Sequence, residues 1–373
     1  MNDFVIRELT TTNIETELVN IGFDKSYIST ASDKYRYKTF KLYNLSIPQA
    51  NIIKQTALSY GADCAVHRDV LVNNIDKTDA ILGGSYSQLL RIVEKLKQQP
   101  FSLKELASYI EEKLRKTPNN ETKIIGIVNL SPDSFSNDGF DNPNKAIEHI
   151  HKLIDDGADI IDIGAESTRP GSIEIPAQEQ IKRLKSVLLN LQDLKVPISL
   201  DTRNSEVARF GLDNGVSIIN DVSGLDFDKK MINIIANYNA SIVIQHTKGT
   251  PDTMQENPYY NDVIDEIYLN LLNKIKKAKE NGIKNIIIDP GIGFGKNKKH
   301  NFEILNRINE FKTLNCPIMV GLSRKSFLCP SEISNEGKDA LSLALAYPLI
   351  QNKIDYLRVH NVKLHKQLLS QAI

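Results

Sequence analysis

From residue 123 onward, short apolar runs rich in β-branched residues alternate with longer stretches that carry apolar residues at helical spacing. Runs that are apolar at every position are typical of parallel strands buried on both faces. Eight such runs are expected to be strands, at residues 124–130, 160–167, 198–203, 218–223, 241–247, 285–291, 318–323 and 356–361. Helices are expected between them, most clearly at residues 178–191, 262–281 and 339–351.

Eight strand–helix units in about 250 residues predict an α/β protein with a (β/α)8 TIM barrel. An open, doubly wound sheet is the alternative for the same alternation. That fold usually places a glycine-rich phosphate turn after its first strand. Here the corresponding residues, 129–135, read Asn-Leu-Ser-Pro-Asp-Ser-Phe, which favours the barrel.

The first 115 residues have a different rhythm and predict a small N-terminal mixed α/β extension of unassigned role. Strands are expected at residues 37–42 and 79–84, and helices at residues 48–59 and from Ser85. The polar, proline-containing segment 116–122 is typical of a linker. We therefore expect three parts: residues 1–115, the linker 116–122, and a barrel over residues 123–373.

Two local patterns in the extension carry their own predictions. Ser102 and Glu105 have the spacing of a capping box, which would open a helix ending near Leu114. The adjacent residues His67, Arg68 and Asp69 are interpreted as a surface ion cluster rather than a site, because charges of this kind are usually solvated.

Composition narrows the class of protein. The chain has 46 Lys+Arg and 46 Asp+Glu, and therefore no net charge that would favour nucleic acid or an anionic membrane. No apolar run approaches the roughly 18 residues that span a bilayer, and the N-terminus lacks the layout of a secretory signal. Three scattered cysteines exclude a disulfide framework. These features predict a cytoplasmic protein that binds neither nucleic acid nor membrane.

Polar residues follow nearly every predicted strand. In a barrel, the carboxyl ends of the strands face the active site, so these side chains are expected around one pocket. Cations suited to a phosphate-rich group are Arg169, Lys325, Arg358 and His360, and groups suited to a neutral, donor-rich ligand are Asp201, Asn220 and Asp289. The long loops at residues 131–144 and 164–176 follow the first two strands and are expected to act as lids.

Five segments at these strand ends resemble the motifs of dihydropteroate synthases, a family of pterin-binding barrels. They lie at residues 129–136, 162–171, 289–296, 323–326 and 358–360. The resemblance covers the barrel and offers little for residues 1–115. It implies condensation of 6-hydroxymethyl-7,8-dihydropterin diphosphate with 4-aminobenzoate, which gives 7,8-dihydropteroate and diphosphate in folate biosynthesis.

The resemblance also implies roles for particular residues. Asp289 would accept two parallel hydrogen bonds from the pterin edge, a geometry that suits one carboxylate. The rest of the pterin would meet Asp201, Asn220, Phe294 and Lys325. The catalytic groups at the diphosphate would be Thr168, Arg169, Lys325, Arg358 and His360. Asn129 would help to hold Mg²⁺, Ser323 would meet the carboxylate of 4-aminobenzoate, and the protein would be a homodimer.

Two positions depart from the family pattern. Asn361 stands where an Asp usually follows the Arg-Val-His motif, and Gln245 stands where a Met is usual. Outside the motifs, residues 296–299 are interpreted as a solvated basic loop and His365 as a surface histidine. For His246, a hydrogen bond within the barrel and a ligand contact both stay open.

Two rival functions also stay open. A pterin-barrel methyltransferase would share the grip on the pterin but would have no use for the Ser-Thr-Arg-Pro-Gly and Ser-Arg-Lys-Ser segments around an anionic leaving group. A non-catalytic pterin-binding subunit would have no need to retain Asn129, Arg169, Lys325, Arg358 and His360 together.

Overall fold

The computed structural model describes residues 6–9, 13–72, 74–115, 121–130, 140, 142–166, 174–249, 254–325, 327–328 and 333–372. The chain divides into two compact units, Met1–Pro118 and Asn119–Ile373. The division falls inside segment 116–122, which the sequence indicated as a linker. Among the described residues, no helix has both the length and the apolar character needed to cross a membrane.

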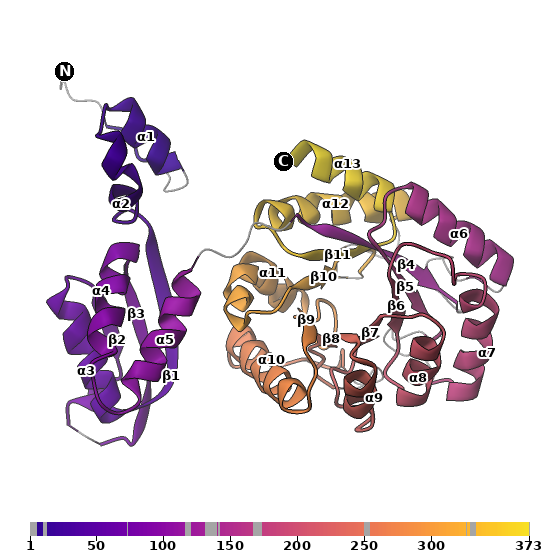
Figure 1. Ribbon diagram of the computed structural model, residues 1–373, viewed down its shortest axis with the longest axis horizontal. Helices are drawn as coiled ribbons and strands as arrows, with labels where there is room; N and C mark the ends of the chain where they lie inside the picture. Colours follow the sequence, from indigo (N-terminus) through magenta and orange to yellow (C-terminus); the bar gives the residue numbers. More distant parts are fainter. Residues whose placement is uncertain are drawn as a thin grey trace. The chain divides into compact units, whose positions relative to one another are not determined.

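The second unit is a closed barrel of eight parallel strands, as the sequence predicted (Figure 1). Its strands are β4 (Lys123–Asn129), β5 (Ile160–Gly164), β6 (Ile198–Asp201), β7 (Ile218–Asp221), β8 (Ser241–Gln245), β9 (Asn285–Asp289), β10 (Met319–Gly321) and β11 (Tyr356–Val359). Their hydrogen-bonded order is β10-β11-β4-β5-β6-β7-β8-β9. A parallel bridge between Ile288 and Ile318 joins the two ends, which excludes the open, doubly wound alternative.

The barrel has an apolar interior and an apolar outer layer. One residue from each of six strands fills the interior as a separate buried cluster: Ile125, Ile160, Ile218, Val243, Ile287 and Met319. The outer faces of the strands pack against surrounding helices in a much larger cluster. This double burial explains why the runs are apolar at every position, and it leaves the polar residues to the strand ends.

Helices surround the barrel (Figure 1). They are α6 (Pro143–Asp155), α7 (Ala177–Leu188), α8 (Ser205–Asp213), α9 (Met231–Tyr238), α10 (Val263–Glu280), α11 (Lys298–Asn306), α12 (Asn335–Gln351) and α13 (Val362–Ala372). Several of these helices begin with a side chain that caps their N-terminus. The Asn204 side chain accepts from the backbone N–H groups of Glu206 and Val207, and Asp262 caps α10 in the same way, as expected for N-cap residues.

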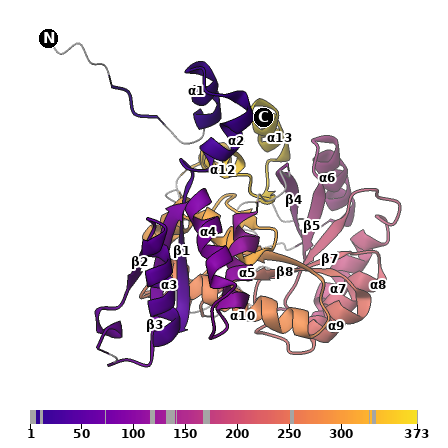
Figure 2. The same ribbon diagram turned by 60° about the vertical axis from the view of Figure 1, so that its left-hand side comes forward.

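The first unit contains a three-stranded antiparallel sheet of order β1-β3-β2, formed by β1 (Tyr37–Ser46), β2 (Asp63–Val66) and β3 (Lys77–Ser85). Helices α3 (Ile47–Ser59), α4 (Tyr86–Leu96) and α5 (Leu103–Leu114) lie alongside the strands (Figure 2). They bury one face of the sheet in a core of their own. Two short helices, α1 (Ile14–Asn20) and α2 (Ile28–Ser32), precede the sheet.

The predicted capping box at Ser102 is wrong. Ser102 adopts a left-handed backbone conformation (φ 56°, ψ 20°) and its side chain makes no capping hydrogen bond. An N-cap side chain reaches the N3 amide from an extended backbone, which Ser102 does not have. Capping boxes of this unit lie instead at Ser46, before α3, and at Ser85, before α4. The Ser85 hydroxyl accepts from the backbone N–H of Gln88, and the Gln88 side chain accepts from the backbone N–H of Ser85.

Candidate active site

The closed barrel brings the predicted polar residues to one rim. Five of them lie in or at the end of a strand: Asn129 (β4), Asp201 (β6), Asn220 (β7), Asp289 (β9) and Arg358 (β11). Parallel strands place all their carboxyl ends at the same end of the barrel. Residues that are up to 229 positions apart in the sequence therefore surround the same axis.

Arg358 is the centre of a buried ion cluster. Its Nε lies 2.6 Å from Oδ2 of Asp162, and its guanidinium also donates to Oδ2 of Asp201 at 2.8 Å. The side-chain amide of Asn220 donates to the same oxygen of Asp162 at 3.4 Å. Asp162 is not among the residues to which the sequence predictions gave a role. The available signal was an acid inside the otherwise apolar run of β5, since a buried carboxylate requires a partner.

Three acceptor atoms of this cluster have no donor among the described residues. They are Oδ1 of Asp162, Oδ1 of Asp201 and Oδ1 of Asn220, all of them buried. A buried acceptor without a hydrogen bond costs free energy, about 1–3 kcal/mol each. Three such atoms at one end of the barrel therefore fit a bound molecule that presents several N–H donors.

Asp289 is buried beside the cluster. Its Oδ1 accepts from the backbone N–H of Gly291 at 2.7 Å. Burial raises the pKa of Asp289, and the Gly291 hydrogen bond opposes this rise together with Lys325, Lys296 and Arg358. Asp289 ends β9 and Arg358 lies in β11, so both belong to the carboxyl-terminal end of the barrel, as the predicted ligand requires.

Asp201 is a buried carboxyl group with a strongly raised pKa. Burial raises the pKa of Asp201 to about 7, and the nearby Asp162 carboxylate adds to the rise, while Arg358 and Lys325 oppose it. A carboxyl group whose pKa is moved this far by burial and specific neighbours is typical of a functional site.

Two further pairs of predicted residues contact each other. Nζ of Lys325 lies over the ring of Phe294, 4.1 Å from its centroid, a cation–π contact. The Ser323 hydroxyl oxygen lies 2.8 Å from Nδ1 of His360 and accepts from the His360 backbone N–H at 3.1 Å. Phe294 and Ser323 are thereby each positioned by a predicted cationic residue.

Some predicted residues cannot be placed. Thr168 and Arg169 lie outside the described residues, as do most of the predicted lid loops. Asn129 is described and ends β4, with its Oδ1 facing Gly164 at the end of β5. In the described part of the chain, no group of three or more His, Cys, Asp or Glu side chains is arranged to hold a metal ion.

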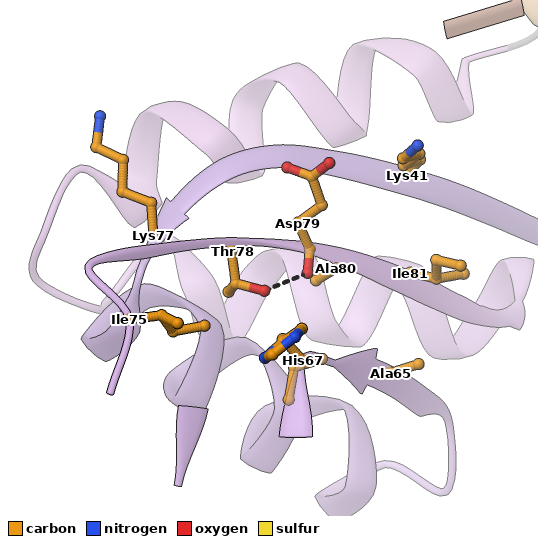
Figure 3. A pocket seen from close by; sticks show the side chains of 10 residues that line it. Lys41, Ala65, His67, Ile75, Lys77, Thr78, Asp79, Ala80 and Ile81 are labelled. Atoms are coloured by element: carbon orange, nitrogen blue, oxygen red, sulfur yellow. Dashed lines mark hydrogen bonds between the residues drawn. The ribbon is translucent and has the colours of Figure 1, made fainter. Parts of the chain in front are cut away.

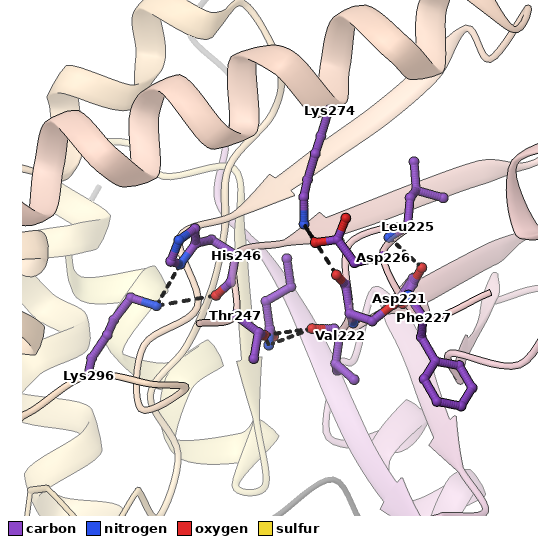
Figure 4. A network of polar contacts seen from close by, with 11 residues as sticks. Asp221, Val222, Leu225, Asp226, Phe227, His246, Thr247, Lys274 and Lys296 are labelled. Carbon is purple, nitrogen blue, oxygen red and sulfur yellow. Dashed lines mark hydrogen bonds and ion pairs between the residues drawn. The ribbon is translucent and has the colours of Figure 1, made fainter. Parts of the chain in front are cut away.

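The structure corrects two expectations about single residues, those for Lys296 (Figure 4) and His365. Lys296 is not solvated: it is 2% exposed, and its Nζ lies 3.0 Å from Nδ1 of His246. Beside this pair, Asp221 ends β7, and both its carboxylate oxygens accept from Ser223 and Leu225 in the loop that follows. His365 is buried, with Nδ1 2.7 Å from the carbonyl oxygen of Asn361.

The two departures from the family pattern have local partners. The amide of Asn361 donates to Asp339 at 3.3 Å, and its oxygen accepts from the backbone N–H of Leu364 at the start of α13. Asp339 in turn holds Arg324 through two hydrogen bonds. A carboxylate at position 361 would face the Asp339 carboxylate, and the neutral amide avoids that repulsion.

The side chain of Gln245 is also hydrogen-bonded within the barrel. Its amide nitrogen donates to the carbonyl oxygen of Val222 at 3.3 Å and to the hydroxyl of Thr247 at 3.0 Å. The polar end of Gln245 therefore joins β8 to the end of β7.

The N-terminal unit has a groove of about 590 Å³ (Figure 3). Its lining includes Lys41, His67 and Lys77 beside one acid, Asp79, whose carboxylate accepts from the backbone N–H of Asn44. Arg68 also forms an exposed ion pair with Asp69 at 3.7 Å, as the sequence indicated, and Nδ1 of His67 accepts from the Asp69 backbone N–H at 3.2 Å.

The chain is similar to known proteins in both sequence and fold. The sequence profile described as pterin binding enzyme matches residues 125–360. The bifunctional dihydropteroate synthase/dihydropteroate reductase of Helicobacter pylori is 32% identical over 376 residues, which cover 98% of this chain and 97% of that protein. The crystal structure of dihydropteroate synthase from Clostridium difficile in the presence of pteroic acid is 37% identical, with a TM-score of 0.63, over 69% of this chain and 98% of that one.

A third relative is much longer than this chain. The probable bifunctional folylpolyglutamate synthase/dihydropteroate synthase of Haloferax volcanii is 35% identical over 343 residues, which cover 84% of this chain. The chain spans only 40% of the length of that protein.

Proposed function

The chain belongs to the pterin-binding enzymes, and from this membership we propose that it is a dihydropteroate synthase, a transferase of folate biosynthesis. It condenses 6-hydroxymethyl-7,8-dihydropterin diphosphate with 4-aminobenzoate and releases diphosphate. The observation that carries the proposal is the set of buried acceptors without donors on Asp162, Asp201 and Asn220. A pterin ring is flat and presents N–H groups along its edges, which these oxygens can accept.

Recognition of the pterin begins with Asp289. The exocyclic amine and the neighbouring ring N–H are parallel donors, and an ionised carboxylate accepts both. Asn220 and Asp201 accept from other ring positions, with Asp162 beside them. Lys325 donates to the ring carbonyl, and Phe294 provides an apolar wall next to it.

Catalysis depends on charge that develops as diphosphate leaves. Negative charge grows on the leaving group, so cations fixed nearby stabilise the transition state more than the ground state. Arg358 is such a cation, because Asp162 and Asp201 hold its guanidinium in one orientation. His360, Arg169 and Lys325 complete the basic side of the site, and the Thr168 hydroxyl adds a neutral hydrogen-bond donor to the diphosphate.

The second substrate attacks once the carbon–oxygen bond to diphosphate breaks. Positive charge on the pterin methylene is delocalised into the electron-rich ring, so the aromatic amine adds to a stabilised carbon. The resulting anilinium is acidic and releases its proton to solvent, and no side chain is needed as general base. The hydroxyl of Ser323, oriented by His360, meets the carboxylate of 4-aminobenzoate.

Mg²⁺ is part of the proposal. The side-chain oxygen of Asn129 at the end of β4 is a hard, neutral donor, and Mg²⁺ typically combines one or two protein oxygens with water and substrate phosphates. When bound, the ion would neutralise charge on the diphosphate. The absence of a dense acidic cluster among the described residues agrees with a site completed by the substrate.

The proposal also covers the oligomeric state and the location of the protein. A homodimer is supported by the outer surface of α12, where Leu341 and Tyr347 are 38% and 49% exposed. Light scattering of the purified chain tests this state directly. A cytoplasmic location is proposed from the sequence features given above.

The defining experiment measures diphosphate release by the purified protein. We expect release only when the pterin diphosphate, 4-aminobenzoate and Mg²⁺ are all present, with dihydropteroate formed in equal amount. Release without the amine would indicate a hydrolase. Pterin binding without any release would favour the non-catalytic subunit, and methyl transfer from methyltetrahydrofolate to a corrinoid would favour the methyltransferase.

A second activity, dihydropteroate reductase, is proposed from the Helicobacter pylori relative, because its alignment includes nearly all of the N-terminal unit. Such a reductase adds a hydride and a proton across a C=N bond of the pterin ring, and the hydride must come from a reduced nicotinamide or flavin. The test supplies dihydropteroate and either donor, and looks for tetrahydropteroate. Formation of none with both donors would remove this second activity and leave the synthase untouched.

A further inference from the structure

A buried lysine lies behind the proposed pterin site. Lys296 is 2% exposed, and its Nζ donates to the carbonyl oxygen of His246 at 3.2 Å (Figure 4). The same nitrogen donates to the carbonyl oxygen of Phe294 at 2.9 Å. Nδ1 of His246 lies 3.0 Å from the same nitrogen. A lysine ammonium has three donors, and these contacts account for all three.

These contacts join the end of β8 to the loop that follows β9. The backbone N–H of His246 donates to the carbonyl oxygen of Asp289 at 2.9 Å. Gly291 then passes so close to His246 that a Cβ atom there would collide with the His246 carbonyl, and Gly295 meets the Lys248 carbonyl in the same way. The loop therefore lies flat against β8, and Lys296 fixes the carbonyl of Phe294 to it.

We propose that Lys296 is a positioning residue of the pterin site: its buried ammonium holds the loop that presents Phe294 and sets a positive charge beside Asp289. The inference rests on the proposed function and adds a residue to it. Packing alone does not explain a lysine here, because an apolar side chain of similar volume fills a buried position at lower cost.

The surrounding charges explain why a cation is useful at this place. Asp289 on β9 is the acid that most strongly favours the charged form of Lys296. Three lysines oppose that form: Lys248, Lys274 on α10 and Lys325. Burial lowers the pKa of Lys296 to about 7, and Asp289 opposes that fall. Lys296 is therefore charged below about pH 7, and its charge there favours the ionised form of Asp289.

The neighbouring histidine is suited to this arrangement. Burial, together with the charge of Lys296, holds the pKa of His246 well below its usual range. His246 is neutral and accepts through Nδ1 instead of competing as a second cation. Tyr260 and His300 continue the packing behind it, with ring centroids 4.9 Å apart, and the Tyr260 hydroxyl donates to the Gly295 carbonyl at 2.9 Å.

The test compares Lys296→Met with Lys296→Arg, and uses Lys299→Met as the matched control, since Lys299 is exposed on the same segment. Steady-state rates are measured for both substrates from pH 5 to pH 9. For Lys296→Met we expect the KM for pterin diphosphate to rise about tenfold, equivalent to about 1.4 kcal/mol, with little change in the KM for 4-aminobenzoate. The acid limb of kcat/KM for the pterin should move to higher pH. Lys296→Arg should restore that limb, and Lys299→Met should match the wild type.

The outcomes separate this inference from the function on which it rests. A wild-type protein that forms no dihydropteroate overturns the proposed function. An active wild type whose Lys296→Met variant keeps the pterin KM and the acid limb overturns the role of Lys296. If Lys296→Met does not fold, Lys296→Gln retains donors for the two carbonyls without the charge, and an unmoved acid limb in that variant also overturns the inference.

Discussion

At the residue scale, the site is a small number of buried charges that must be balanced against one another. Arg358 serves two acids at once, and Asp289 depends on the nearby cations Lys325, Lys296 and Arg358. Each of these charges is buried, so each would cost free energy if it had no partner of opposite charge. Removing one is therefore expected to alter the others as well as its own contact with substrate.

Replacement of Asp289 by Ala should weaken pterin binding most directly. The carboxylate accepts two hydrogen bonds in the proposed complex, and truncating a buried charged partner costs about 2–5 kcal/mol. Calorimetry with the pterin diphosphate measures the loss. Asp289→Asn, which keeps the shape and one acceptor, should lose less. Equal affinity of Asp289→Ala and the wild type would contradict the assignment.

Asp201 should give the protein a specific dependence of stability on pH. Its pKa rises from 3.8 in the unfolded reference to about 7 in the folded protein. Between these values the folded state binds more protons than the unfolded state, so the free energy of unfolding falls as the pH rises from about 4 to about 7. Asp201→Asn cannot ionise and should reduce this fall by about 1–3 kcal/mol.

Urea unfolding of the wild type and Asp201→Asn at pH 4, 5.5 and 7 checks this prediction. The difference between the two proteins should change in favour of the variant as the pH rises. A difference that is the same at all three values would mean that Asp201 does not carry the titration.

At the scale of secondary structure, Ser85 and Ser102, which each precede a helix of the N-terminal unit, make a matched pair. Ser85 caps α4 with its side chain, whereas Ser102 before α5 does not. Loss of a capping side chain costs about 0.5–2 kcal/mol. Ser85→Ala should therefore lower the free energy of unfolding of this unit by that amount, and Ser102→Ala should change it little. Urea titration followed by circular dichroism measures both, and an equal loss in both would contradict the prediction.

The same pair shows what the sequence can and cannot predict about an element. Spacing alone put a capping box at Ser102, because the pattern of a serine followed three residues later by an acid is present. The backbone conformation that the cap requires is decided by the preceding turn, where Phe101 is also left-handed. By contrast, all eight barrel strands were predictable, since burial on both faces demands uninterrupted apolar runs.

Side chains at the strand ends were partly predictable for the same reason. The rim position of Asp289 follows from its place at the end of an apolar run. The burial of Lys296 does not, because Lys296 stands in a polar segment whose next three residues are largely solvent-facing. Lys296 is buried because Gly291 and Gly295 let the loop after β9 lie against the end of β8. That contact joins segments far apart in the sequence, so no local sequence pattern predicts it.

At the scale of the whole molecule, the two units have separate hydrophobic cores. The core of the N-terminal unit contains residues between Leu42 and Leu114, and that of the barrel contains residues from Ile124 onward. A unit that buries its own core is expected to fold alone. All the described residues assigned to the synthase site belong to the barrel.

The fragment Asn119–Ile373 should therefore fold and keep the synthase activity. We expect its kcat/KM for both substrates to stay within about threefold of the full chain, since threefold corresponds to under 1 kcal/mol of transition-state stabilisation. If the N-terminal unit carries the reductase, tetrahydropteroate formation should disappear in the same fragment. A folded fragment with a loss of more than about a hundredfold in synthase activity, equivalent to about 2.7 kcal/mol, would mean that the first unit contributes directly to the barrel site. Reductase activity retained by the fragment would instead assign both reactions to the barrel.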